Sequence, residues 1–299
     1  MNMRKAAVFG LLLLGAAILL PAQKTGPKIY VSVDMEGIWG VVHSDQVNST
    51  TSDYGPARRW MAEDVNAVIK GLWAAGAGAV VVNDGHGGMR NIVADALDPR
   101  ASLISGSPKP LSMMQGLDQT FDAVVFVGYH AKAGTAQANL DHTISSSTVY
   151  AIRVNGRELP ELGLNAAIAG YFKVPVIFLT GDGETCAQAK AILGAGLETV
   201  AVKEAIGRTA ARMLPREMSL RLLTEGASQA LKALPQAKPF VLEPPFLFEL
   251  EFHNSAQAEL PLLVPGVKRI GGRSVGFSAD DYLQGFKLLR ALISLGGIN

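Results

Sequence analysis

Two acidic residues stand at the end of an apolar segment near the start of the chain. The stretch KIYVSVDMEG, Lys28 to Gly37, begins like a buried strand and ends with Asp34 and Glu36 two residues apart. Two carboxylates at this spacing repel each other and resist burial unless a positive charge lies between them. A metal cation is the usual group in that position, so the pair predicts that further ligands lie elsewhere in the chain.

Two histidines and a glutamate supply the other candidate ligands. His86 and His130 each follow an apolar run, and Glu161 lies in the opening turn of a predicted helix. In an open α/β sheet, ligands bind in the crevice beyond the carboxyl ends of the strands, so side chains that follow different strands can meet there. The five residues form a nitrogen and oxygen set that suits zinc, or two zinc ions that share one carboxylate: Asp34, Glu36, His86, His130 and Glu161.

Each of these residues also has an ordinary structural interpretation. An aspartate after a strand often caps a turn or a helix, and Glu161 is favourable in the first turn of a helix. Taken alone, His86 is compatible with a loop histidine and His130 with a buried core histidine. The metal hypothesis depends on the comparable positions of all five. His142 lies in a loop further along, where a catalytic or outer-sphere role and a plain surface position are both open.

Alternating β-branched runs and helical patterns predict an α/β fold that would position these residues. The runs Ile29–Asp34, Ala79–Asp84, Ala123–Gly128 and Val174–Asp182 are typical of buried strands. We expect a mostly parallel central sheet flanked by helices, with a smaller C-terminal α+β region. The predicted organisation is a signal peptide over 1–22, a metal-binding α/β catalytic domain over 23–240 and a smaller region over 241–299 packed on it. Asn155-Gly156 between alternating residues predicts a hairpin.

The first 22 residues have the pattern of a secretory signal peptide. Arg4 and Lys5 precede the apolar stretch Ala6–Leu20, and Ala22 offers a cleavage site. The apolar stretch is short for a membrane span, and an uncleaved membrane anchor is the alternative. We therefore expect an exported protein, periplasmic or secreted, without stable membrane association after cleavage. The single cysteine, Cys186, excludes an intrachain disulfide.

The composition favours an ordered globular protein and argues against a nucleic-acid partner. The 299 residues are 48% hydrophobic, and 27 Lys and Arg nearly balance 26 Asp and Glu. The sequence has no dense basic run and no interleaved basic and aromatic stripe, which nucleic-acid binding would require. It contains neither a G-x-S-x-G nucleophile turn nor a phosphate-binding loop. A small or neutral ligand fits this chain better.

Five segments together resemble the DppA-type D-aminopeptidases, zinc metallopeptidases that act on short peptides with D-amino-acid termini. The likeness extends from about Lys28 to the C-terminal helix, and the segments occur in the family's order. They are SVDMEG (32–37), NDGHGGM (83–89), LISGSPKPLSMMQGLD (103–118), GYHA (128–131) and ELGLNA (161–166).

The resemblance implies a dinuclear site with two zinc ions per chain. In that arrangement Asp34 bridges the ions, Glu36 and His130 bind one of them, and His86 and Glu161 bind the other. It assigns catalysis to His142, and it implies a ring-shaped homo-oligomer whose active sites face an inner channel.

The expected function is a zinc-dependent aminopeptidase that hydrolyses short peptides with D-amino-acid N-termini, such as D-Ala-D-Ala, through a metal-activated water. Two alternatives stay open at this point. One is another metal-dependent amidase or esterase on the same scaffold. The other is an exported solute-binding protein, which would need no clustered carboxylates and imidazoles.

Overall fold

A computed structural model describes residues 25–298 of the chain. The predicted signal peptide, 1–22, lies outside the described residues. Within them, no helix has both the length and the apolar character needed to cross a membrane.

The larger of two sheets has seven strands, and the predicted metal-ligand side chains were expected beyond the carboxyl ends of these strands. Its strands pair in parallel except for the antiparallel pair β8 and β9 at one edge, which confirms the mostly parallel central sheet. In spatial order the strands are β3 (Ser102–Ile104), β2 (Ala79–Asp84), β1 (Lys28–Val33), β4 (Ala123–Val127), β7 (Val176–Asp182), β8 (Glu198–Gly207) and β9 (Ala210–Met213).

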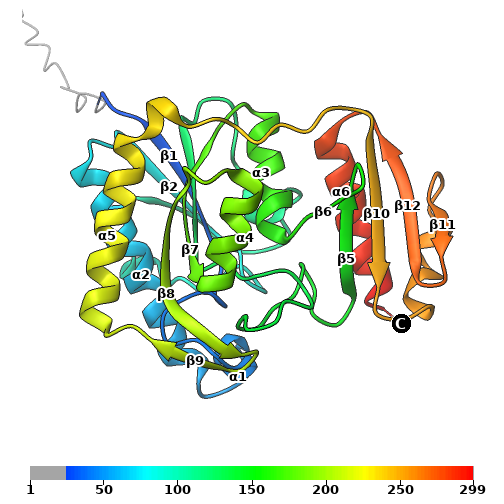
Figure 1. Ribbon diagram of the computed structural model, residues 1–299, viewed down its shortest axis with the longest axis horizontal. Helices are drawn as coiled ribbons and strands as arrows, with labels where there is room; N and C mark the ends of the chain where they lie inside the picture. The colour runs from blue at the N-terminus through cyan, green and yellow to red at the C-terminus, as the bar shows by residue number, and fades with distance from the viewer. Residues whose placement is uncertain (1–24, 299) are drawn as a thin grey trace, which may run out of the picture.

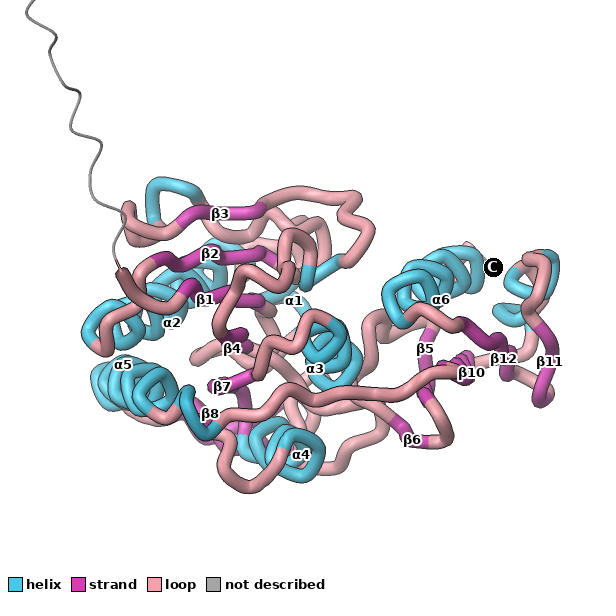
Figure 2. The backbone as a smooth tube through the Cα atoms, turned by 90° about the horizontal axis from the view of Figure 1, so that it is seen from above, coloured by secondary structure: helices cyan, strands magenta, loops and turns pink. Residues whose placement is uncertain are grey.

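Helices cover both faces of this sheet, as Figures 1 and 2 show. On one face α2 (Tyr54–Ala74) packs against α5 (Arg216–Lys232), and on the other lie α3 (Glu161–Tyr171) and α4 (Gly183–Leu193). With both faces covered, β4 and β7 are buried along their whole length, which explains their continuous apolar sequences. The short helices are α1 (Ser44–Val47) and the 3₁₀ turns Ala94–Ala96, Ser112–Met114, Leu234–Gln236, Ala256–Ala258 and Pro261–Leu263.

A second, antiparallel sheet lies beside the first and is covered by the C-terminal helix α6 (Tyr282–Gly296). Its strand order is β11 (Lys268–Gly271), β12 (Ser274–Ala279), β10 (Phe246–Phe252), β5 (Val149–Val154) and β6 (Arg157–Glu158). The strands β5 and β6 form the hairpin predicted at Asn155-Gly156, where both residues have positive φ angles of 52° and 73°. This sheet therefore draws on the chain before residue 241 as well as after it, and the boundary at 240/241 stays a prediction.

The strand order predicts a crevice beyond the carboxyl end of β1, the strand from which the sheet extends in both directions. The chain runs from β1 to β2 and β3 on one side, and β4, β7 and β8 extend the sheet on the other. In such sheets the point where the strand order reverses leaves an opening beyond the carboxyl ends, because the connections on its two sides lead away from each other. Asp34 follows β1 directly at this point.

Candidate metal centre

Backbone contacts hold the loop after β1 against the loop after β4. The Asp34 amide donates to the Val127 carbonyl at 2.8 Å, and the Gly37 amide donates to the Gly128 carbonyl at 2.8 Å. A Cβ on Gly37 would lie 1.9 Å from the Tyr129 carbonyl oxygen. Gly128 has a φ of +72°, and its Cβ would lie 2.4 Å from the Asp34 carbonyl oxygen. Glycine is required at both positions by this close approach.

The loop that carries His86 is held by its own side chains. Asp84 accepts hydrogen bonds from the amides of Asn91 and Ile92 at 2.5 and 2.7 Å and from the Asn91 side chain at 2.7 Å. Asn91 in turn donates to the His86 carbonyl at 2.8 Å. Asp84 thus fixes the backbone of the loop and not the imidazole ring itself.

The structure brings all five predicted ligands together around Asp34. Its Oδ1 lies 3.2 Å from Nδ1 of His86, and its Oδ2 lies 3.4 Å from Nε2 of His130. Nδ1 of His86 also lies 3.1 Å from Oε2 of Glu36, and Nε2 of His130 lies 3.6 Å from Oε2 of Glu161. Two ligand atoms on one tetrahedral zinc ion are about 3.3 Å apart, because its bonds are about 2.0–2.1 Å long. These side chains are therefore spaced like the ligands of metal ions.

The contacts divide the site into two groups. Ligand atoms of Asp34, Glu36 and His86 lie within 4.8 Å of one another, and so do those of His130, His142 and Glu161. Glu36 is thus next to His86, and His130 is next to Glu161, whereas the expected arrangement paired Glu36 with His130 and His86 with Glu161. Because these are contacts between the side chains themselves, the assignment of ligands to individual ions stays a prediction.

Each of the three histidines has one ring nitrogen at a backbone carbonyl. The pairs are His86 Nε2 with Val47 at 2.9 Å, His130 Nδ1 with Ala131 at 3.0 Å and His142 Nδ1 with Leu140 at 2.8 Å. A nitrogen that donates to a carbonyl carries the proton in the neutral ring, so the other nitrogen presents its lone pair to the carboxylates. Among the described residues, Nε2 of His130 is buried without a hydrogen-bond partner. A cation between these lone pairs and carboxylates would remove the repulsion, so the residues fit a zinc site.

Charge coupling within the cluster is visible in its pKa shifts. Burial lowers the pKa of His86 and His130, but the neighbouring carboxylates outweigh burial and raise both pKa values well above the usual range. Burial raises the pKa of Glu36, yet the charge of His86 and its hydrogen bond hold this pKa well below its usual value. Without a metal, protons on the imidazoles thus offset the negative charge of the carboxylates. Bound divalent cations would offset this charge instead.

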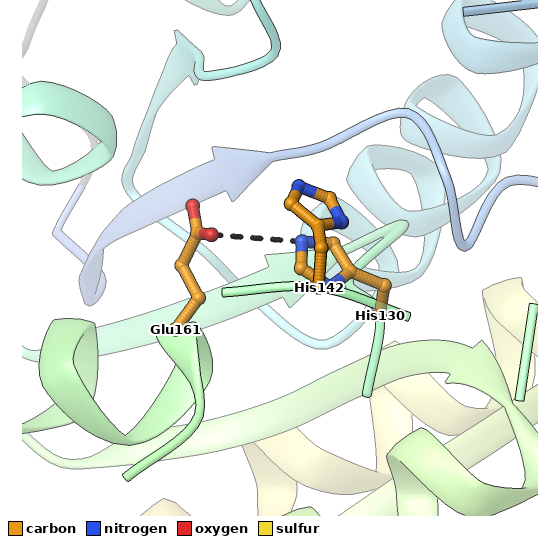
Figure 3. Close-up of side chains that lie close together, drawn as sticks. All are labelled: His130, His142 and Glu161. Atoms are coloured by element: carbon orange, nitrogen blue, oxygen red, sulfur yellow. Dashed lines mark ion pairs between the residues drawn. The ribbon is translucent and has the colours of Figure 1, made fainter. Parts of the chain in front are cut away.

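His142 lies at the rim of the cluster. Its ring stacks on that of His130, with centroids 3.8 Å apart and planes inclined by 14°, and its Nε2 lies 4.0 Å from Oε1 of Glu36. Figure 3 shows His142 and His130 one above the other, with Glu161 beside them. Burial and the charge of His130 lower the pKa of His142, which favours its neutral form.

Residues that sequence reasoning missed hold the backbone of the site. Asp182 caps α4 and accepts a hydrogen bond at 2.7 Å from the amide of Asn139, in the loop that carries His142. Lys203 of β8 is buried and donates from Nζ to the carbonyls of Glu36 at 2.6 Å, Ile38 at 3.1 Å and Val41. The signal available for Lys203 was a lysine within the apolar run TVAVKEAIG.

A pocket of about 480 Å³ opens above the cluster. Its lining includes Asp34, Glu36, His86, His142 and Glu161, together with Arg290 from α6. Pockets of this size bind small molecules, and polar groups that converge on one end fix the orientation of the ligand.

Comparisons with known proteins show what the whole chain is similar to. The profile of a family described as "D-aminopeptidase" matches residues 28–291. A D-aminopeptidase from Bacillus subtilis (strain 168) is 38% identical over 272 residues, which cover 90% of this chain and 97% of the relative. The solved structure of the Zn-dependent D-aminopeptidase DppA from Bacillus subtilis, described as a self-compartmentalizing protease, superposes with a TM-score of 0.88 at 37% identity. This match covers 91% of this chain and 98% of the other.

Proposed function

The chain belongs to the D-aminopeptidase family and is a metallo-aminopeptidase, and on that premise we propose that it cleaves short peptides with a D-amino acid at the N-terminus, such as D-Ala-D-Ala. One observation carries the proposal. The two oxygens of Asp34 face two separate imidazole and carboxylate groups, an arrangement suited to a carboxylate that bridges two metal ions.

The proposed centre holds two zinc ions, with Asp34 shared between them. Glu36, His86, His130 and Glu161 complete the ligand set, and the relative from Bacillus subtilis is described as Zn-dependent. When bound, such a pair of ions supplies a water of lowered pKa and polarises the scissile carbonyl. The backbone carbonyls at His86 and His130 hold the rings in place, so that Nδ1 of His86 and Nε2 of His130 are the atoms that face a metal ion.

His142 has the position of a catalytic group in this proposal. Its Nδ1 is held by the Leu140 carbonyl, so Nε2 is the atom that faces the site. From there it would stabilise the oxyanion of the tetrahedral intermediate or pass a proton to the leaving amine. Stacking on His130 restricts the ring to this orientation.

A substrate and metal profile tests the proposal. We expect the protein loaded with zinc to hydrolyse D-Ala-D-Ala faster than L-Ala-L-Ala and to leave carboxylic and phosphate esters intact. Hydrolysis of esters or of N-blocked amides in preference to the dipeptide would instead support another amidase or esterase on the same scaffold. If the protein holds no zinc after dialysis and cleaves none of these compounds, the results would instead favour a role as a solute-binding protein.

We further propose that the subunits form a ring-shaped homo-oligomer with the active sites facing an inner channel, so that access is limited to small peptides. The description of the Bacillus subtilis relative as self-compartmentalizing supports this proposal. Light scattering should give a mass several times the 31.5 kDa of one chain. A monomer in solution would contradict the proposal.

Export of the enzyme is also a proposal, based on the leader pattern of Met1 to Ala22. An exported enzyme would meet D-alanyl peptides released from the cell wall. Mass spectrometry of the native protein should find a chain that begins at Gln23. A chain that still begins at Met1 would exclude cleavage and favour the membrane anchor.

A further inference from the structure

Arg290 lines the active-site pocket from α6, the helix that covers the second sheet, whereas the predicted metal ligands belong to the first sheet unit. It lies on α6, which two hydrogen bonds fix along α3: Tyr282 donates to the Leu164 carbonyl at 3.0 Å, and Tyr171 donates to Asp281 at 2.8 Å. Further along α6, Arg290 lines the pocket that opens above the metal cluster. Its long side chain thus connects the second sheet unit to the reaction site.

The guanidinium of Arg290 has no partner within the part of the chain that the structure describes. None of those residues lies within hydrogen-bond or ion-pair distance, although the side chain is partly buried. Arg216 is the contrast, because its guanidinium lies 2.6 Å from Glu63 and 2.5 Å from Asp64. Burying a charge without a partner is costly. A partly buried, unpaired guanidinium at a pocket wall therefore calls for an anion from outside the chain.

The charges around the pocket also favour an external anion as the partner of Arg290. Arg290 is the only arginine or lysine among the described residues that line it, and three carboxylates lie near the metal positions: Asp34, Glu36 and Glu161. Burial lowers the pKa of Arg290, while the charge of Glu161 acts in the opposite direction. Once two divalent cations balance the three carboxylates, Glu161 is committed to a metal and no protein anion is left for the guanidinium.

We propose that Arg290 binds the C-terminal carboxylate of the substrate and so makes the enzyme selective for dipeptides with a free carboxyl group. The planar fork of arginine matches a carboxylate with two parallel hydrogen bonds. In a dipeptide the carboxylate is only one residue beyond the scissile bond, and one extended residue spans at most about 3.3–3.6 Å. A pocket of about 480 Å³ that contains both the metal cluster and Arg290 can hold both ends of such a molecule. The inference rests on the proposed function, because it places the amino end at the metal centre.

A purely structural role for Arg290 makes a different prediction. If the guanidinium only offset the charge of Glu161, its loss would disturb the metal centre and slow every substrate equally. If it binds the substrate carboxylate, its loss would matter only for substrates that have one.

The test compares D-Ala-D-Ala with its C-terminal amide, in which a neutral carboxamide of nearly the same shape replaces the carboxylate. We would measure kcat and KM for the zinc-loaded parent, Arg290→Gln and Arg290→Lys, together with zinc content and Tm. Lys287→Gln is the matched control, because it removes a positive charge from an exposed position of the same helix and does not line the pocket.

We expect Arg290→Gln to lower kcat/KM for D-Ala-D-Ala by about 10- to 100-fold, as for the loss of hydrogen bonds to a charged group. The amide should be hydrolysed as before, and Lys287→Gln should behave like the parent with both substrates. Arg290→Lys keeps the charge but loses the fork, so it should fall in between. If Arg290→Gln does not fold, the ratio of the two substrates with Arg290→Lys decides the question.

Two results would overturn the inference, and they differ. Equal losses on the dipeptide and the amide would assign Arg290 a structural role and leave the proposed function intact. Failure of the zinc-loaded parent to cleave either compound would remove the proposed function and the inference with it.

Discussion

Three histidines each commit one ring nitrogen to a backbone carbonyl, and this choice decides which atoms can bind a metal. For His86 the free atom is Nδ1, whereas for His130 and His142 it is Nε2. The carbonyls come from Val47, Ala131 and Leu140, so the tautomers are set by the backbone and not by other side chains. A ligand held in this way loses little entropy when the ion arrives.

Different roles for Asp34 and His142 predict different defects. Asp34→Ala should lose zinc and activity together, because the shared carboxylate is removed. His142→Ala should retain zinc and lower kcat on D-Ala-D-Ala by about 10²- to 10⁴-fold, the usual contribution of acid–base catalysis. Metal analysis and steady-state kinetics measure both effects, with His253→Ala, an exposed histidine of the second sheet unit, as the control. Parent activity in His142→Ala would remove its catalytic role.

Lys203 predicts a specific pH dependence of stability. Burial lowers its pKa from 10.5 to about 8 in the folded protein. Between these pH values the unfolded chain binds a proton that the folded chain does not, so raising the pH stabilises the folded state. Within this window the parent should gain up to about 1.4 kcal/mol per pH unit relative to Lys203→Met, which cannot titrate.

Urea unfolding in the presence of a chelator measures this difference in the free energy of unfolding. Lys70→Met, at an exposed position of α2, is the control for removing a lysine. A constant difference between the parent and Lys203→Met from pH 8 to 10.5 would show that Lys203 keeps its proton throughout.

At the scale of elements, the close approach of the loops after β1 and β4 sets the geometry of the site. Gly37→Ala places a Cβ 1.9 Å from the Tyr129 carbonyl oxygen, a backbone atom that cannot move without shifting the neighbouring His130. We expect a loss of about 3 kcal/mol in the free energy of unfolding, at the upper end for overpacking, and a weaker affinity for zinc. Denaturant titration and metal binding measure the two effects.

Gly55→Ala is the matched control for that substitution. Gly55 lies in the first turn of α2, and a Cβ there would meet nothing within 4 Å. A methyl group at such a site should leave the stability unchanged or raise it by about 0.4–1 kcal/mol. Equal stability of the Gly37→Ala and Gly55→Ala variants would show that the two loops are not tightly coupled.

The sequence predicted the buried core of the parallel sheet and less of its edges. The strands β1, β2, β4 and β7 were predicted because strands covered on both faces have continuous apolar sequences. The edge strand β3 has only three residues, and the antiparallel pair of β8 with β9 was also missed. The pairing of β5 with β10 joins residues about a hundred positions apart, and no local pattern encodes such a contact.

The site was predictable where side chains follow strand ends and where the resemblance applies. The clustering of Asp34, Glu36, His86 and His130 is of this kind, and their roles as metal ligands stay a prediction. Lys203 donates hydrogen bonds to backbone carbonyls far away in the sequence. Arg290 was noticed only because its guanidinium has no partner among the described residues. Neither property is visible before the chain is folded.

At the scale of the whole molecule, the site collects residues from Asp34 to Arg290 and from both sheet units. Metal binding should therefore stabilise the complete fold, because only the folded chain assembles the ligands. At zinc concentrations about 100-fold above the dissociation constants, we expect each bound ion to add about 2.7 kcal/mol to the free energy of unfolding and about 5–10 °C to the Tm, relative to the chelated protein. Asp34→Ala should show no such rise. If zinc leaves the Tm of the parent protein unchanged, metal binding does not stabilise the fold.

Anomalous diffraction at the zinc absorption edge would show whether Asp34 bridges two zinc ions, as we propose. Crystals of the parent protein grown with zinc should show two peaks of anomalous density, about 3.5–4 Å apart, on either side of Asp34. Glu36, His86, His130 and Glu161 should complete the two ligand sets. A single peak, or zinc bound away from Asp34, would exclude a bridging role for Asp34.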